Sequence, residues 1–270
     1  TVTIGSNTSI AGPINVYAGT INLNANLNTS SGGAAGDVLI KASGAITQAS
    51  NISITTSGGD VTYWADSDGA NGGYVWFKSG SSVSTTSAAN ITVSGGNVAD
   101  VASLAASGFA SGMTTTMGNG VTLDGVSLSS FGGNIAIRGK SASSMTAYTA
   151  SDVGSVSNAN GIRAHGSVNV DAGAGKLSMW GYAQSSSGSS NGIELSTTAS
   201  TYKSSSSAAA PLFGSIGADT LTATGVNQVI EAGAGNDTIT VGSALINSLA
   251  LGGSINGDTG TDTLVLSASN

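Results

Sequence analysis

The segment NGVTLDGVSLSSFGGNIAIRG, residues 119–139, contains three pairs of aliphatic residues separated by polar stretches. Within each pair the two aliphatic residues flank a single residue: Val121 and Leu123, Val126 and Leu128, Ile135 and Ile137. A period of two is typical of a β-strand with one buried face. The Gly, Asn and Ser residues between the pairs accept the backbone angles of tight corners. The segment therefore predicts three short strands joined by corners.

The same module recurs along the chain, with further copies that begin at Asn71, Asn160 and Asn191. The intervals between successive copies are unequal, and most of this variation lies in the loop after the third pair. A solenoid tolerates unequal periods because each coil stacks on its neighbour while insertions leave at the side. Residues 1–63 repeat the pattern with shorter loops. We therefore predict a β-helix with side loops over residues 1–210.

Two local alternatives remain open at this point. The stretch VTLDGVSL, residues 121–128, also resembles a β-hairpin with an Asp-Gly turn, which favours an antiparallel sandwich. The other copies have Ala164–Ser167 and residues 196–198 at that place and do not keep the turn, so a coil corner fits better. The alanine-rich stretch 99–110 is compatible with one short helix or with a loop.

A different pattern, G-x-D-x-φ-x with φ aliphatic, occurs three times near the C-terminus. Its Asp residues are Asp219, Asp237 and Asp262, and the second spacing is longer than the first. Glycine lets a tight loop turn its carbonyl groups inward, and a carboxylate adds a hard oxygen ligand of the kind Ca²⁺ prefers. The alternative is a series of Gly/Asp-rich turns that holds no ion.

These three copies resemble the nonapeptide G-G-x-G-x-D-x-φ-x of the repeats-in-toxin (RTX) family, a parallel β-roll loaded with calcium. The resemblance implies that residues 211–270 form a degenerate RTX-like roll stacked on the same solenoid. The spacing of Asp219 and Asp237 equals two nonapeptides, which implies that they lie one turn apart and share an ion, whereas the third loop need not complete a second site. The metal ligands that the resemblance implies are Gly217, Asp219, Gly235, Asn236, Asp237, Asp258 and Asp262.

The module of residues 1–205, NG-φ-x-φ … GG-N-φ-x-φ, resembles the haemagglutination-type β-helix of bacterial surface adhesins related to filamentous haemagglutinin. Together the two resemblances imply an all-β chain, a right-handed parallel β-helix (β-solenoid) that continues into a short parallel β-roll. They imply a secreted, non-catalytic structural or adhesive module of a large bacterial cell-surface or matrix protein, stiffened by Ca²⁺. One alternative is a self-assembling subunit of an extracellular filament or surface layer.

A second alternative is a carbohydrate-active β-helix enzyme, and the sequence disfavours it. Such sites combine clustered acids with a Lys or Arg that stabilises developing negative charge. The seven basic residues are scattered singly along the chain, and the lone histidine, His165, is interpreted as a corner residue. We therefore expect no enzymatic activity.

Composition limits the partners. Only 8% of the residues are charged and the net charge is −7, which argues against nucleic acid and anionic lipid. The absence of cysteine excludes disulfides and thiolate metal sites. No apolar run is long enough for a membrane-spanning helix, so no membrane insertion is expected. The expected partners are adjoining modules or copies of the chain, and glycans or another cell surface.

The segment 62–78 contains five of the 13 aromatic residues. Alignment of the third strands places Trp64 and Trp180 at the same outward position. With Asp66 and Asp68 nearby, an outward Trp would stack on a sugar whose hydroxyls bond the carboxylates. The alternative is that side loops cover both Trp residues. Asp66 and Asp68 also have the spacing of a small calcium loop.

Overall fold

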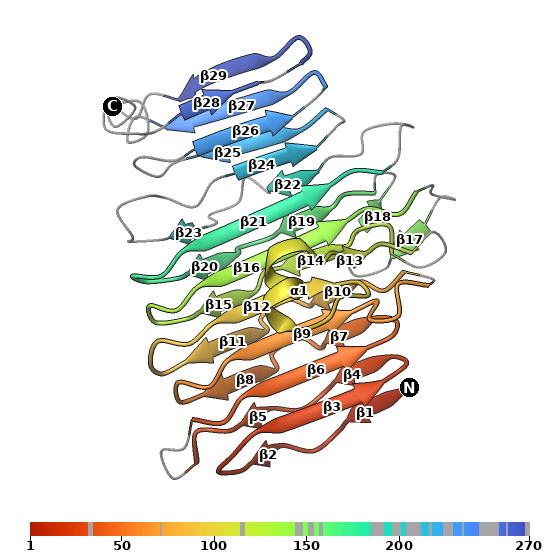
Figure 1. Cartoon of the computed structure of the whole chain (residues 1–270), viewed down its shortest axis with the longest axis vertical. Coiled ribbons are helices and arrows are strands. Elements are labelled where there is room, and N and C mark those ends of the chain that lie inside the picture. The colour runs from red at the N-terminus through yellow and green to blue at the C-terminus, as the bar shows by residue number, and fades with distance from the viewer. Residues whose placement is uncertain are drawn as a thin grey trace.

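The computed structural model is a three-faced parallel β-helix in which most turns contribute one strand to each of three parallel sheets (Figure 1). The structure describes residues 1–31, 35–70, 72–113, 117–143, 148–150, 154–156, 159–184, 192–195, 201–203, 212–215, 218–223, 229–233, 235–242, 254–257 and 259–267. Every pair of adjacent strands within the three sheets is parallel. The predicted β-helix is therefore confirmed, and the antiparallel sandwich is excluded.

Sheet 1 has ten strands, in stacking order: β1 (Val2–Ile4), β4 (Ile21–Leu23), β7 (Ile46–Gln48), β10 (Val75–Phe77), β14 (Val121–Asp124), β19 (Ile162–His165), β22 (Ile193–Leu195), β25 (Thr220–Ala223), β27 (Thr238–Gly242) and β29 (Thr263–Ser267). Sheet 2 contains β2 (Thr8–Ser9), β5 (Leu27–Asn28), β8 (Ser53–Thr56), β11 (Ser82–Thr85), β15 (Ser127–Ser129), β20 (Asn169–Asp171) and β23 (Thr201–Lys203). Sheet 3 contains β3 (Ile14–Ala18), β6 (Val38–Ala42), β9 (Val61–Ala65), β12 (Ile91–Gly95), β16 (Ile135–Lys140), β21 (Leu177–Tyr182), β24 (Leu212–Ser215), β26 (Val229–Gly233) and β28 (Ser254–Asn256).

The two longest connections, 96–120 and 141–161, run from sheet 3 to sheet 1, which confirms that the largest insertions follow the third strand of a module. In the first turns this connection is only residues 19–20 or 43–45, whereas later it spans 66–74, 96–120 and 141–161. The second of these carries helix α1 (Val101–Ser107) and β13 (Ala110–Ser111), and the third carries the antiparallel hairpin β17 (Tyr148–Ala150) and β18 (Gly154–Val156). The largest insertions therefore leave the coil at the edge between sheets 3 and 1.

Helix α1 resolves the ambiguity of the alanine-rich stretch in favour of a helix. The Asp100 carboxylate accepts a hydrogen bond from the Ser103 N–H at 2.7 Å, which is the geometry of an N-cap. Its single fully buried residue, Leu104, anchors the helix beside sheet 3 (Figure 1).

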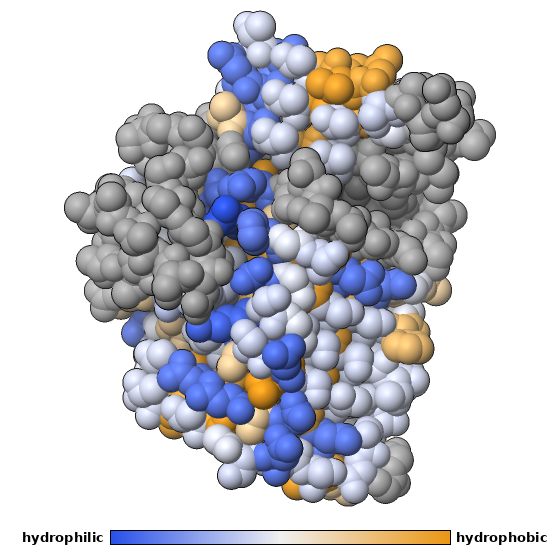
Figure 2. Space-filling model, turned by 180° about the vertical axis from the view of Figure 1, so that it is seen from behind, coloured by the Kyte–Doolittle hydropathy of each residue, from blue (hydrophilic) through white to orange (hydrophobic). Residues whose placement is uncertain are grey.

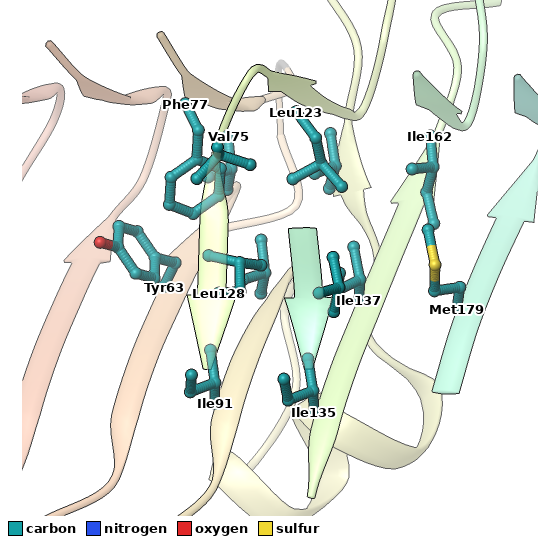
Figure 3. Packing of buried hydrophobic residues seen from close by; sticks show 14 of the residues in the cluster. Tyr63, Val75, Phe77, Ile91, Leu123, Leu128, Ile135, Ile137, Ile162 and Met179 are labelled. Carbon is teal, nitrogen blue, oxygen red and sulfur yellow. The ribbon is translucent and has the colours of Figure 1, made fainter. Parts of the chain in front are cut away.

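The core is a stack of aliphatic layers contributed by the inward residue of each strand (Figure 3). In sheet 1, Val75 pairs with Val121 and Val121 with Ile162, so like side chains lie directly above one another. Each fully buried Val, Leu or Ile contributes about 1.5–3 kcal/mol relative to exposure. All six residues of the three pairs predicted in 119–139 lie in this core.

Asn and Asp side chains also connect the coils, at the corner that precedes sheet 3. Oδ1 of Asp37 accepts the Asp60 N–H at 2.9 Å, and Oδ1 of Asp60 accepts the Asn90 N–H at 2.7 Å. Asn90 and Asn134 continue the ladder to the next coils at 3.0 and 2.9 Å. These bonds satisfy corner N–H groups that the sheet ladders do not reach.

Among the described residues of the C-terminal part, each turn of the solenoid contributes two strands instead of three. Strand β23 is the last described strand of sheet 2, and from β24 to β29 the strands alternate between sheets 3 and 1. Thr220 pairs with Thr238, so one turn here spans two nonapeptides, as in the predicted roll. Thr238 pairs with Thr263, so the insertion between β27 and β28 leaves the register intact.

Phe131 is an unfavourable residue at its corner. It has φ of 50° and is largely exposed, a rare backbone conformation for a bulky side chain. The register of β15 with β20 aligns it with Gly173, which has φ of 59°. A left-handed backbone at a non-glycine residue costs about 1–2 kcal/mol.

Phe131→Gly is therefore expected to raise the free energy of unfolding by about 1 kcal/mol, after subtraction of the extra chain entropy of glycine. Chemical denaturation of the variant and the unsubstituted chain measures the difference. Gly173→Ala is the reverse control and should destabilise, because its added Cβ would lie 2.9 Å from the Gly132 nitrogen. A lower midpoint for Phe131→Gly would contradict this account of the corner.

Candidate functional site

Asp219, Asp237 and Asp262 form one column in the C-terminal turns. Each immediately precedes a strand of sheet 1, and the register of β25, β27 and β29 stacks the three residues one turn apart. The pairing of Glu194 with Thr220 places Asp219 at the level of the inward-facing Ile193. The carboxylates thus continue a core column that is aliphatic in the turns before them.

Hydrogen bonds between turns fix this aspartate column. The Asp219 N–H donates to Oδ1 of Asp237 at 2.8 Å, and the Asp237 N–H donates to Oδ1 of Asp262 at 3.0 Å. The Gly192 N–H donates in the same way to Oδ1 of Asp219. Each carboxylate accepts from the preceding turn, which is the opposite direction to the Asp37–Asn134 ladder. The one-turn separation inferred for Asp219 and Asp237 is confirmed, and Asp262 joins the same column despite its longer spacing.

The aspartate column holds negative charge in a poorly hydrated place. Asp219 and Asp237 are 2% and 1% exposed. Burial raises the pKa of Asp237 to about 6; the hydrogen bond from the Asp219 N–H opposes this rise, and the carboxylates of Asp219 and Asp262 add to it. Oδ2 of Asp237 is buried without a hydrogen-bond partner among the described residues. An unpaired buried carboxylate oxygen is costly unless a proton or a cation reaches it.

The donor set of the column is entirely oxygen and suits a hard cation. Asp219 and Asp237 supply buried carboxylates, whereas Oδ1 of the predicted ligand Asn236 accepts the Thr261 N–H at 2.9 Å. Gly235 lies two residues before Asp237 in the same loop and has φ of 134°. Gly217 and Asp258 lie outside the described residues. Within the described ranges, no three His, Cys, Asp or Glu side chains gather closely enough to hold a metal, so Ca²⁺ would also need backbone carbonyls or water.

The raised pKa of Asp237 predicts that, with chelator present, the protein becomes more stable as the pH falls from about 7.5 to 5. The folded-state pKa of about 6 lies above the ordinary value of 3.8, so protonation is easier in the folded state. The free-energy cost of burying the ionised carboxylate is full above the folded-state pKa and decreases as the pH falls through that value. Thermal melting across this range measures the effect.

Asp237→Asn should flatten that pH dependence. Asp37→Asn, which replaces an exposed carboxylate and keeps the Oδ1 acceptor of the corner ladder, should leave it as in the unsubstituted chain. An unchanged pH response in Asp237→Asn would show that another group controls it.

Trp64 is covered rather than exposed, as the alternative interpretation of segment 62–78 expected. It is 3% exposed, and its Nε1–H donates to the Gly96 carbonyl at 2.8 Å. The Lys41 ammonium lies 3.5 Å from its ring centroid. Asp66, with φ of 51°, is buried as well, while Asp68 is exposed and its Oδ1 accepts the Ala70 N–H at 3.1 Å. Burial leaves Trp64 and Asp66 without the open surface that the predicted sugar contact requires.

Trp180, half-buried, takes part in a second covered stack. The Arg138 guanidinium lies 4.2 Å from the Trp180 ring centroid and 4.4 Å from that of Phe109, and its Nε donates to the Gly108 carbonyl. Burial lowers the pKa of Arg138 to about 10. The outward column of sheet 3 therefore contains two cation–aromatic stacks, Lys41 with Trp64 and Arg138 with Trp180, and Ser94 lies between them. The Arg138 stack, through Phe109 and Gly108, holds the 96–112 loop against the coil.

A polar group on the outer face of sheet 1 was not expected from the sequence. In the strand register Asp124 lies beside His165, and Arg163 lies beside Glu194. Phe77 pairs with Leu123, so the next residue, Lys78, is level with Asp124. We call these five residues, Lys78, Asp124, Arg163, His165 and Glu194, the sheet 1 charge cluster. Interpreting the basic residues as scattered singly was wrong here, because two of them and the only histidine share this face. Two positions of the module carry this cluster: the residue between the two aliphatic residues of the first pair, and the residue after that pair. An alignment of the modules at these two positions would have shown that the charges share one face.

Comparison with protein-family models, with curated proteins and with solved structures finds no match for this chain. No helix within the described parts of the chain is long and apolar enough to cross a membrane.

Proposed function

We propose that the chain is a non-catalytic structural and adhesive module of a large bacterial surface or matrix protein, active outside the cell. The observation that carries this proposal is the uninterrupted parallel stack, which makes each turn a rung of a stiff rod. Stacked strands add about 4.8 Å of length per turn and satisfy one another's backbone groups. Such a rod serves as a spacer and presents its faces and side loops to a partner.

Calcium is proposed as the ion that stiffens the C-terminal turns. The support is the aspartate column, in which like charges stack and Oδ2 of Asp237 is buried with no partner in the described part of the chain. Asp219 and Asp237 would hold the ion, which neutralises their charge. Calcium outside a cell would then favour the folded roll, and folding would be coupled to export.

Millimolar Ca²⁺ is expected to raise the free energy of unfolding by about 1–3 kcal/mol when its concentration is roughly 10- to 100-fold above the dissociation constant. Thermal melting with Ca²⁺ and with chelator measures the shift. Asp237→Asn should remove most of it, because it deletes the central charge of the column. Asp37→Asn, an exposed Asp of the corner ladder, is the matched control and should keep the full shift. Superimposable melting curves in Ca²⁺ and chelator would remove calcium from the proposal.

Self-assembly into a filament or surface layer is the second candidate function, favoured by the exposed face of β29. Leu264, Val265 and Leu266 are 51%, 40% and 61% exposed on this edge strand, and an apolar group is visible at the C-terminal end in Figure 2. An uncovered apolar strand edge is a template for pairing with another strand.

If β29 mediates assembly, Leu266→Lys should reduce fibres in negative-stain micrographs taken in Ca²⁺, because an edge lysine opposes strand pairing. Ala88→Lys, which adds the same charge at an exposed corner between β11 and β12 and away from the strand edge, is the control. Discrete rods from the unsubstituted chain at high concentration would count against assembly and leave adhesion as the function.

A further inference from the structure

We propose that the sheet 1 charge cluster binds a neutral saccharide. This inference rests on the proposed adhesive function and gives it a ligand class and a place. It moves glycan recognition away from Trp64 and Asp66, which are buried, to the outer face of β10, β14, β19 and β22.

The first support is the concentration of charge in a chain that has little. Only 8% of the residues are charged, and there is one histidine. The outward residues of earlier strands in sheet 1 are uncharged, namely Thr3, Asn22 and Thr47, which pair in register. Four consecutive strands then bring Lys78, Asp124, Arg163, His165 and Glu194 to the same face. Stability of the coil does not require them, because the coil continues before them without any.

The second support is that the cluster is held in a fixed geometry. Glu194 accepts from Arg163 Nε at 3.4 Å through Oε1 and from Asn160 through Oε2. His165 Nδ1 lies 3.6 Å from Oδ1 of Asp124. The Lys78 ammonium lies 4.4 Å from the centroid of the buried Trp76 ring. A rigid polar group loses little conformational entropy on binding a ligand.

The third support is unmet hydrogen-bonding capacity. Nη1 of Arg163 and Nε1 of Trp76 are buried donors with no acceptor among the described residues, and Thr122 separates the two residues in the strand register. Buried donors are paired in most proteins, so these two call for an oxygen atom that the described part of the chain does not provide. His165, whose side chain is 49% exposed, and Glu194, at 34%, leave the cluster open to solvent.

The charges determine the class of ligand. Two cations, Lys78 and Arg163, stand beside two carboxylates, Asp124 and Glu194, so the cluster is nearly neutral and offers donors and acceptors side by side. A sugar hydroxyl both donates and accepts, and it matches this arrangement. A polyanionic chain would meet the two carboxylates and a net charge of −7. The cluster therefore fits a neutral saccharide rather than an acidic one.

The test is binding of the full chain, in Ca²⁺, to an array of immobilised neutral and acidic oligosaccharides, followed by calorimetry with the best neutral ligand. We expect binding to neutral members. Asp124→Asn and His165→Gln should each weaken it about tenfold or more, because each removes a hydrogen bond of a charged or polar side chain. Circular dichroism and melting temperature check that both variants are folded.

Two variants serve as matched controls. Asp68→Asn changes an exposed carboxylate of the 66–74 connection, and Lys176→Gln changes an exposed cation at another corner; both should keep the affinity. Loss of binding in Asp68→Asn but not in Asp124→Asn would overturn the proposal in favour of the loop. Binding to acidic oligosaccharides alone would also overturn the proposal, and so would the absence of binding to any oligosaccharide on the array. The calcium-dependent melting shift would be unaffected by either result, so the two proposals fail separately.

Discussion

The parallel register between successive turns is the constraint on which the whole structure depends. A strand with a period of two has only two ways to face the core, and a slip of one residue would expose every aliphatic side chain. The pairing of Val75 with Val121 and of Val121 with Ile162 shows the register kept across connections of very different length. In the turns before the aspartate column the core stays mostly apolar, and the corner amides meet the Asp37–Asn134 ladder.

This constraint explains why so much of the fold was predictable from the sequence. Pairs such as Ile135 and Ile137 signal strand faces directly, and the failure of the modules to keep an Asp-Gly turn separates a coil from a hairpin. Within the described ranges sheet 2 ends at β23, where the longer module changes to the nonapeptide. Local patterns suffice wherever packing repeats from one turn to the next.

The candidate sites were less predictable because they depend on what the side loops cover. Alignment placed Trp64 on the outside of sheet 3, but the pattern does not show that the 96–112 loop folds back over it. Gly96 and Gly108, which accept from Trp64 and Arg138, are ordinary loop residues in the sequence. Lys78 and His165 look isolated because they lie far apart along the chain, and only the stacking of β10, β14 and β19 brings them to one face. The aspartate column was predictable because the spacing of its first two members equals one turn.

The two longest connections, 96–120 and 141–161, leave the coil at the edge between sheets 3 and 1, and this has a consequence for how such a protein changes over time. Residues gained or lost there alter what the molecule presents to its surroundings without disturbing a rung of the ladder beneath. The faces of sheets 2 and 3 are fixed by repetition, whereas this margin is free to vary. Related proteins are therefore expected to differ most in the connections at this edge and to keep the stacked strands almost unchanged.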